Sequence, residues 1–360
     1  MSKAHLRPEL LALLQLSAPR VSENEYEAIL LSLPASFNWT YFLERAIATK
    51  LAGYLLPYPS IAQQKFPTFV LEKIKGYQQL ILLHSVQLRE AILVFAPQLD
   101  TAQIPYALLK GWDLHFRHGA SLKQRQISDI DILISEKDLD QLEILLQQNA
   151  YQTTRHNYKS SFHQKWLPTH APLSARKAGM ILDVHTNAFA KEHRIELALH
   201  LDNKVKIALP EGGQVWVLDE AEAQLFLAFH AIKHLEALHD FKAAQISELN
   251  MAGCDSAQLS KKEKDLLQKL SAFIERAQNL QLNPNESYDA FYIQQLAGGK
   301  TQLHIKIRQI LQRFKLKTSF GKSIVLGYFD LFPRKSYLES RFGKGNYWLL
   351  NLKRFQKSSR

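Results

Sequence analysis

The strongest constraint on how this chain can fold comes from residues 128–134, Ser-Asp-Ile-Asp-Ile-Leu-Ile. Side chains of a β-strand point alternately to opposite faces, so a strand here places Asp129 and Asp131 together on one face. The three isoleucines share the other face and are expected to pack into a core. Neighbouring carboxylates repel unless a cation lies between them, basic side chains flank them or water solvates them fully. A hard divalent metal ion is the simplest explanation.

A second strand-like run, residues 180–185 (Met-Ile-Leu-Asp-Val-His), carries another acid. The same alternation places Asp183 and His185 on one face. If this strand lies beside the first, three carboxylates converge, and such an oxygen-rich set suits Mg²⁺ in phosphoryl chemistry. Because an Asp-x-Asp pair also occurs by chance at strand ends, the inference depends on the combined pattern.

A turn, Lys110-Gly111, follows an earlier apolar run at residues 104–109. A glycine at the end of a strand lets the backbone approach a phosphate closely, and Lys110 supplies positive charge. Together with the two acidic runs, this turn favours a site for a metal ion and a phosphate over a chance arrangement of acids.

The first hundred residues are expected to form a helical region. Apolar residues recur there every three or four positions, and prolines punctuate them. Members of one such apolar cluster are Ile74, Tyr77, Leu80 and Leu83. We therefore predict a helical N-terminal region over residues 1–100.

Strand-like runs predict a small mixed-sheet core over residues 101–218. Ser135 and Asp219, each with an acid three residues later, predict helix starts. Residues 219–360 are expected to be mostly helical, with a basic tail. The predicted fold class is α+β, with helical regions on either side of the mixed-sheet core.

Charge is distributed unevenly along the 360 residues. The net charge is +11, from 45 Lys and Arg against 34 Asp and Glu. Residues 300–360 hold 15 of those bases and two of the acids, hence +13, whereas residues 1–299 carry −2. Such a segment indicates an anionic partner, such as nucleic acid, a membrane surface or a phosphorylated substrate, or else a solvated helical face.

Composition excludes several classes of protein. With 46% apolar and 22% charged residues, the chain is too apolar and too weakly charged to be disordered. A single cysteine, Cys254, excludes a disulfide framework or a cysteine-rich zinc module. No apolar run reaches about 18 residues and no signal-peptide pattern is present, so we expect no transmembrane segment and a cytoplasmic location.

These segments together resemble the uncharacterised nucleotidyltransferase family within the DNA polymerase β-like superfamily. In that family an apolar strand leads to Leu-Lys-Gly, as at residues 109–111, and an Arg precedes an Asp-x-Asp strand, as Arg125 precedes residues 129–131. An Asp-x-His strand follows, as at residues 183–185. The resemblance covers residues 60–245, and a weaker similarity extends into the C-terminal region.

The resemblance implies a metal-dependent enzyme that transfers a nucleoside monophosphate from a nucleoside triphosphate to an acceptor hydroxyl, releasing pyrophosphate. Asp129 and Asp131 would bind two Mg²⁺ ions, with Mn²⁺ as an alternative metal. Asp183 would bind the catalytic ion and help to deprotonate the acceptor. The residues implied to bind the nucleotide are Lys110, Gly111, Arg125 and His185. In one departure, Trp112 follows Gly111 where the superfamily usually has a second small residue ahead of its carboxylates.

Two classes of function remain open. The first is a nucleotidyltransferase that acts on a small molecule, a peptide or a protein, with a nucleic acid as a variant acceptor. The second is a non-catalytic protein on the same fold that binds nucleic acid through residues 300–360, where aromatic and basic residues mix. The presence of all three acids favours catalysis, because a site without chemistry has no reason to keep three clustered carboxylates.

Overall fold

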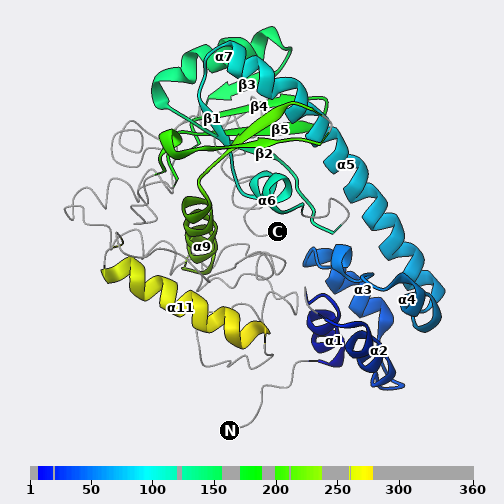
Figure 1. The fold of residues 1–360 in the computed structure, drawn as a ribbon. Helices are drawn as coiled ribbons and strands as arrows, with labels where there is room; N and C mark the ends of the chain where they lie inside the picture. Colours follow the sequence, from blue (N-terminus) through cyan, green and yellow to red (C-terminus); the bar gives the residue numbers. More distant parts are fainter. Residues whose placement is uncertain are drawn as a thin grey trace, which may run out of the picture. The chain divides into compact units, whose positions relative to one another are not determined.

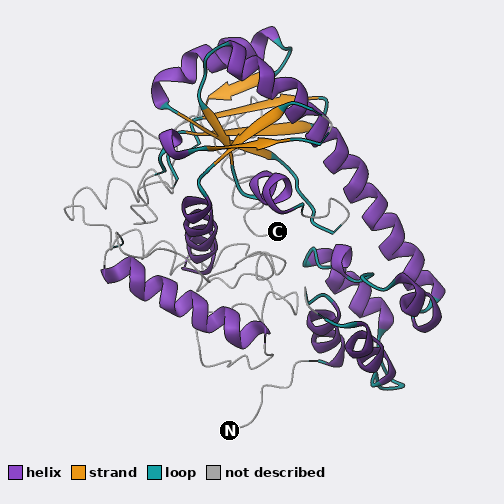
Figure 2. Cartoon of the chain, viewed as in Figure 1, coloured by secondary structure: helices purple, strands orange, loops and turns teal. Residues whose placement is uncertain are grey.

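The computed structural model describes residues 7–18, 21–119, 124–155, 171–188, 199–210, 212–236, 259 and 261–278. Within these ranges helices precede, interrupt and follow a mixed seven-stranded sheet, so the fold is α+β, as expected (Figure 1). Figure 2 shows the same helices and strands coloured by type. The basic segment 300–360 lies outside the described residues, and so do the expectations attached to it.

The described residues before the sheet are mainly helical. Their elements are α1 (Pro8–Leu16), α2 (Glu23–Leu31), α3 (Trp39–Ala48), the 3-10 turn η1 (Ala52–Tyr54), α4 (Pro59–Lys65) and α5 (Thr68–Thr101). Local chemistry sets several of their starts. Ser22 and Glu25 form a reciprocal capping box at α2, and Pro59 occupies the first turn of α4, where a missing N–H costs nothing.

Seven strands form the sheet, in the order β3-β4-β5-β2-β1-β7-β6. Their bounds are β1 (Tyr106–Leu108), β2 (Ile130–Ile134), β3 (Gln152–Arg155), β4 (Leu173–Lys177), β5 (Met180–His185), β6 (Val205–Ala208) and β7 (Gln214–Val217). Strand β1 pairs with β7 in parallel, whereas the β3–β4, β4–β5 and β6–β7 pairs are antiparallel. The other elements are α6 (Gly111–His118), η2 (Glu136–Asp138), α7 (Leu139–Gln148), η4 (Leu201–Asn203), α9 (Glu220–Glu236) and α11 (Lys261–Gln278).

The two expected helix starts have different outcomes. At α9, the Asp219 carboxylate accepts hydrogen bonds from the backbone N–H groups of Ala221 and Glu222, at 2.9 and 3.4 Å, so the predicted cap is confirmed. After β2, Ser135 makes no side-chain cap, and the chain passes through the 3-10 turn η2 before α7 begins. The short turn separates Ser135 from the α-helix it was expected to cap.

The described residues form two compact units. The first takes its residues from 1–103, 107–130 and 203–299, and it includes α1–α6, β6, β7, α9 and α11. The second includes β3, β4, β5, α7 and all of β2 except its first residue. The division passes between Ile130 and Asp131, inside β2. The three regions expected from the sequence stay a prediction.

The apolar cluster that indicated a helix does not form the packed face of the longest helix, α5. Leu80 and Leu83 are 68% and 59% exposed. Residues spaced by three drift around a helix, so Ile74 and Leu83 lie about 180° apart. The side chains on the buried face include Ile74, Ile81, Ser85, Leu88 and Ile92, which follow a three- and four-residue alternation. This face lies against η1, α3 and β7 within the first unit.

By length and composition alone, α5 is also long and apolar enough to cross a membrane. In the part of the chain that the structure describes it alone meets this criterion, and 33% of the apolar window lies buried inside the protein. A helix that packs against a protein core passes the same test. The expected absence of a transmembrane segment is therefore not confirmed.

Two leucine substitutions in α5 distinguish its packed face from its exposed face. We expect Leu88→Ala to lower the free energy of unfolding by about 2–5 kcal/mol, because it opens a cavity at a fully buried position. Leu80→Ala, at an exposed position, should change it by less than about 0.5 kcal/mol. Urea denaturation measures both. Equal effects would contradict the packing described here.

Candidate active site

The two acids of the Asp-x-Asp run have different surroundings. All five residues of β2 are buried, and Asp131 is only 4% exposed. Leu133, which shares a face with Asp131, is also buried, so this face is shielded from water as the isoleucine face is. Asp129 precedes the strand and is partly exposed. Alternation predicted two acids in equivalent surroundings. The structure instead has one buried acid, Asp131, and one partly exposed acid, Asp129.

Asp131 contacts His185, the last residue of β5. His185 Nε2 lies 2.7 Å from Asp131 Oδ1, and both side chains are almost fully buried. Strand β5 is the neighbour of β2 in the sheet, so the adjacency that the sequence left as a condition is present. A carboxylate in such surroundings is tolerated only when it is paired. His185 provides one such partner for Asp131.

Asp183 has a hydroxyl partner on the adjacent strand. The antiparallel register places Ser174 of β4 directly opposite Asp183 of β5, and the Ser174 hydroxyl donates a hydrogen bond to Asp183 Oδ1. Sequence reasoning missed Ser174, because strand register decides which residues face each other. Its only signal is the alternation of Leu173, Ser174 and Ala175, which places the serine between two buried residues.

The acids were expected to hold a metal ion. Among the described residues, no group of three or more His, Cys, Asp or Glu side chains gathers closely enough to do so. The donor chemistry itself fits Mg²⁺, which prefers carboxylate oxygens. Asp131 and Asp183 each have Oδ1 in a contact with a neighbouring side chain, and such contacts commonly orient a metal-binding carboxylate.

The turn between β1 and α6 has an unusual backbone. Lys110 adopts φ 56° and ψ −119°, a region that residues with a Cβ rarely occupy. Helix α6 begins at the next residue, Gly111. Strained conformations of this kind persist only where the surroundings enforce them, and they cluster at functional sites. The first turn of α6, whose backbone N–H groups lack partners within the helix, therefore directly follows this strained residue.

Gly111 accommodates the side chain of Arg125. A Cβ built on Gly111 would lie 1.7 Å from Arg125 Nη1, so any other residue would displace the guanidinium. The first turn of a helix carries a partial positive charge, which disfavours a cation beside it. An anion placed at this point would be attracted by both the guanidinium and the helix. The structure thus brings together two of the residues expected to bind the nucleotide.

Trp112 ties this turn to the acidic strand. Its indole N–H donates a 3.0 Å hydrogen bond to the backbone carbonyl of Asp129, and the side chain is 1% exposed. The residue that departs from the superfamily pattern therefore connects α6 to Asp129, directly before β2. Sequence reasoning treated Trp112 only as a departure, because its partner is 17 residues away along the chain.

Asp113, the next residue of α6, is a buried acid that sequence reasoning missed. Arg117 donates to it through Nε at 3.0 Å, and Arg117 also donates to the carbonyl of Leu218. Burial raises the pKa of Asp113 to about 6, although Arg117 opposes this shift. Nearby Glu220 raises the pKa slightly further. These contacts connect α6 to the junction between β7 and α9.

The chain matches the model of a known protein family. The model of the family described as uncharacterised nucleotidyltransferase matches residues 35–298. No curated protein matches the sequence. Among solved structures, the chain is similar to the antibiotic-resistance factor ANT(2'')-Ia, with 15% sequence identity and a TM-score of 0.33 over 55% of this chain and 96% of that one. The family match spans β1, α6 and both acidic strands.

Removing the histidine beside Asp131 should destabilise the protein. We expect His185→Ala to lower the free energy of unfolding by about 3 kcal/mol, because it removes a partner from a buried carboxylate. The double variant with Asp131→Asn should lose less than the sum of the two single variants, because no charge is then left buried. Urea denaturation of the four proteins gives the coupling energy. Strict additivity would contradict a direct pair.

Stability should also depend on pH through Asp113. The native protein keeps Asp113 protonated up to pH about 6, whereas the unfolded chain releases this proton near pH 3.8. The native state therefore binds more protons in this window, and the free energy of unfolding falls with rising pH by up to about 3 kcal/mol. Asp113→Asn should lack this slope. Its control, Asp265→Asn, removes an exposed acid paired with Lys269. Parallel profiles for wild type and Asp113→Asn, measured by denaturation from pH 4 to 7, would refute the assignment.

Proposed function

Because the chain belongs to the uncharacterised nucleotidyltransferase family, and is therefore a nucleotidyl-transferring enzyme, we propose how its residues carry out the reaction. An acceptor hydroxyl attacks the α-phosphorus of a nucleoside triphosphate. The new O–P bond forms as the bond to pyrophosphate breaks, and the hydroxyl proton passes to a carboxylate. The acceptor is a small molecule, a peptide or a protein.

The observation that carries the proposal is the position of Arg125 against Gly111. The guanidinium and the first turn of α6 present positive charge at one place, and a triphosphate supplies the anion that both would attract. The planar guanidinium can donate two parallel hydrogen bonds to phosphate oxygens. Lys110, at the strained position of the turn, adds a further charge. We assign the triphosphate to this turn.

We assign the metal to the three acids. Asp129, Asp131 and Asp183 would hold Mg²⁺, or Mn²⁺, through carboxylate oxygens, and the ion would offset negative charge on the phosphates. Support comes from the adjacency of β2 and β5 and from the separation of Asp129 and Asp131 by one residue. In this assignment His185 orients Asp131 through their 2.7 Å contact. Direct contact between His185 and the nucleotide stays a prediction.

Asp183 is the proposed acceptor of the hydroxyl proton. Its Oδ1 accepts the hydrogen bond of Ser174, so we assign the proton of the attacking hydroxyl to Oδ2. Ser174 then holds the carboxylate in one orientation while the other oxygen faces the acceptor. A proton acceptor must lie within hydrogen-bonding distance of the group it deprotonates, and a fixed rotamer helps to maintain that geometry.

Transfer of radioactive label tests this function. The full chain is incubated with Mg²⁺, each α-³²P nucleoside triphosphate in turn, and cell extract as the source of acceptor. We expect labelled product with wild type and a loss on the order of 10²-fold or more in Asp129→Asn, Asp183→Asn and Arg125→Ala, because each loses a charge that the reaction requires. Asp265→Asn, at an exposed helical position, should retain full transfer.

Asp129 is the most informative position, because it is partly exposed and its replacement leaves the buried pair of Asp131 and His185 intact. Equal labelling by wild type and Asp129→Asn would contradict the proposed enzymatic mechanism. Salt-sensitive binding of RNA or DNA that survives this substitution, but not deletion of residues 300–360, would instead support a nucleic-acid-binding protein.

A further inference from the structure

We propose that the helical region before the sheet positions the nucleotide site, because Gly53 and Tyr77 clamp the loop that carries Arg125. This inference rests on the proposed function, since it gives the clamp the task of holding Arg125 where a triphosphate binds. The loop, residues 124–127, leads into β2. Gly53 and Tyr77 are positioning residues in this proposal, because they act on the loop and not on the nucleotide.

The first contact of the clamp is between two backbones. A Cβ built on Gly53 would lie 2.0 Å from the carbonyl oxygen of Gln124 and 2.8 Å from its carbonyl carbon. Backbone atoms cannot swing aside as a side-chain tip can, so only glycine lets η1 approach the loop this closely. The carbonyl of Gly53 in turn accepts a 2.8 Å hydrogen bond from the side chain of Gln78 on α5.

The second contact comes from α5 itself. The hydroxyl of Tyr77 donates a 3.1 Å hydrogen bond to the side-chain oxygen of Gln126. Tyr77 is half-buried, and burial raises the pKa of its hydroxyl, so the group remains a donor at neutral pH. Tyr77 and Gln78 are consecutive residues of α5. Tyr77 contacts the loop directly, and Gln78 contacts η1, the turn that packs against the loop.

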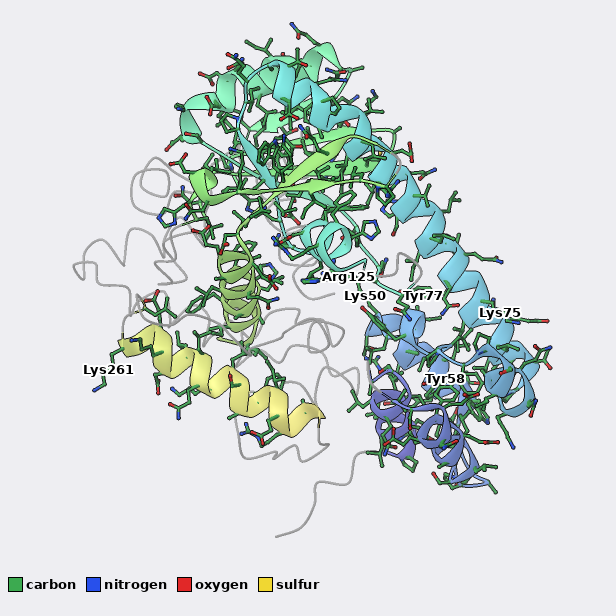
Figure 3. All side chains as sticks on the ribbon, viewed as in Figure 1. Lys50, Tyr58, Lys75, Tyr77, Arg125 and Lys261 are labelled. Carbon is green, nitrogen blue, oxygen red and sulfur yellow. The ribbon has the colours of Figure 1, made fainter. Side chains whose placement is uncertain are left out.

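Along the loop, residues that contact the helical region alternate with residues that lie near Gly111. Gln124 and Gln126 meet the helical region, whereas Arg125 and Ile127 both approach Gly111, with Ile127 Cγ1 3.3 Å from the position of a built Cβ. Ile127 is 5% exposed and anchors the loop from that side. Figure 3 shows Arg125 and Tyr77 close together, with Tyr58 further away among the N-terminal helices. Arg125 thus projects from a segment held at the residues on both sides of it.

This arrangement has a clear physical use. An arginine side chain loses conformational freedom when it binds an anion, and a loop that is already ordered reduces that cost. The guanidinium lies beside Gly111 at the start of α6, and an ordered loop keeps it at this point. The clamp supplies this order from residues that the nucleotide never touches.

Two variants and one matched control test the clamp in the full-length protein. Gly53→Ala forces the loop away from η1, and Tyr77→Phe removes one hydroxyl without changing the ring. Tyr58→Phe is the control, because its hydroxyl donates a similar 2.9 Å hydrogen bond to the carbonyl of Val21, within the same helical region. Hydrogen–deuterium exchange over residues 124–130 reports loop order, and calorimetry with each α,β-methylene nucleoside triphosphate and Mg²⁺ reports affinity.

We expect faster exchange over residues 124–130 in Gly53→Ala and Tyr77→Phe, and about threefold to tenfold weaker binding of the best-bound nucleotide. Tyr58→Phe should match wild type in both measurements. If wild type binds a nucleotide and neither variant changes the exchange rate or the affinity, the clamp is overturned. If wild type binds no nucleotide but the loop still loosens, the proposed function fails and with it the positioning role, whereas the contact itself stands.

Discussion

The close packing of Arg125 against Gly111 is the contact on which the rest of the candidate site depends. It requires a glycine at the first position of α6, a loop that returns to that point, and a strained residue, Lys110, immediately before it. It also places a cation beside the positive end of a helix, and an anion at this point would be attracted by both. Trp112 then connects the same turn to the backbone of Asp129. The phosphate turn and Asp129 are thereby linked inside one compact unit.

The burial of β2 determines how the two acids of the Asp-x-Asp run differ. A strand covered on both faces cannot present a pair of equally accessible carboxylates, so the run divides into a buried Asp131 paired with His185 and a partly exposed Asp129. Asp183 is held in turn by Ser174. Each of these two strand acids has a neighbour that fixes its orientation. This is the property that a ligand or a proton acceptor needs in order to act at a defined position.

Much of the fold could be predicted from local patterns. Alternation located β5 at its observed bounds, and an acid at Asp219 marked the start of α9 correctly. The core face of α5 could not be predicted in this way, because Leu80 and Leu83 are as apolar as Leu88 and only packing distinguishes them. Ser174 and Trp112 were missed for a related reason, since their partners are set by strand register and by a turn.

The amino-acid sequence by itself determined the chemistry of this protein: an Asp-x-Asp run, an Asp-x-His strand, a Lys-Gly turn and the family to which they belong. Local rules suffice for these features, because alternation and turn preferences act between residues a few positions apart. The tertiary structure decided which of these residues meet: His185 with Asp131, Ser174 with Asp183, and Arg125 with Gly111 beneath a clamp from the helical region. Such contacts depend on strand order, register and helix packing, which form only when distant segments bury their surfaces against one another.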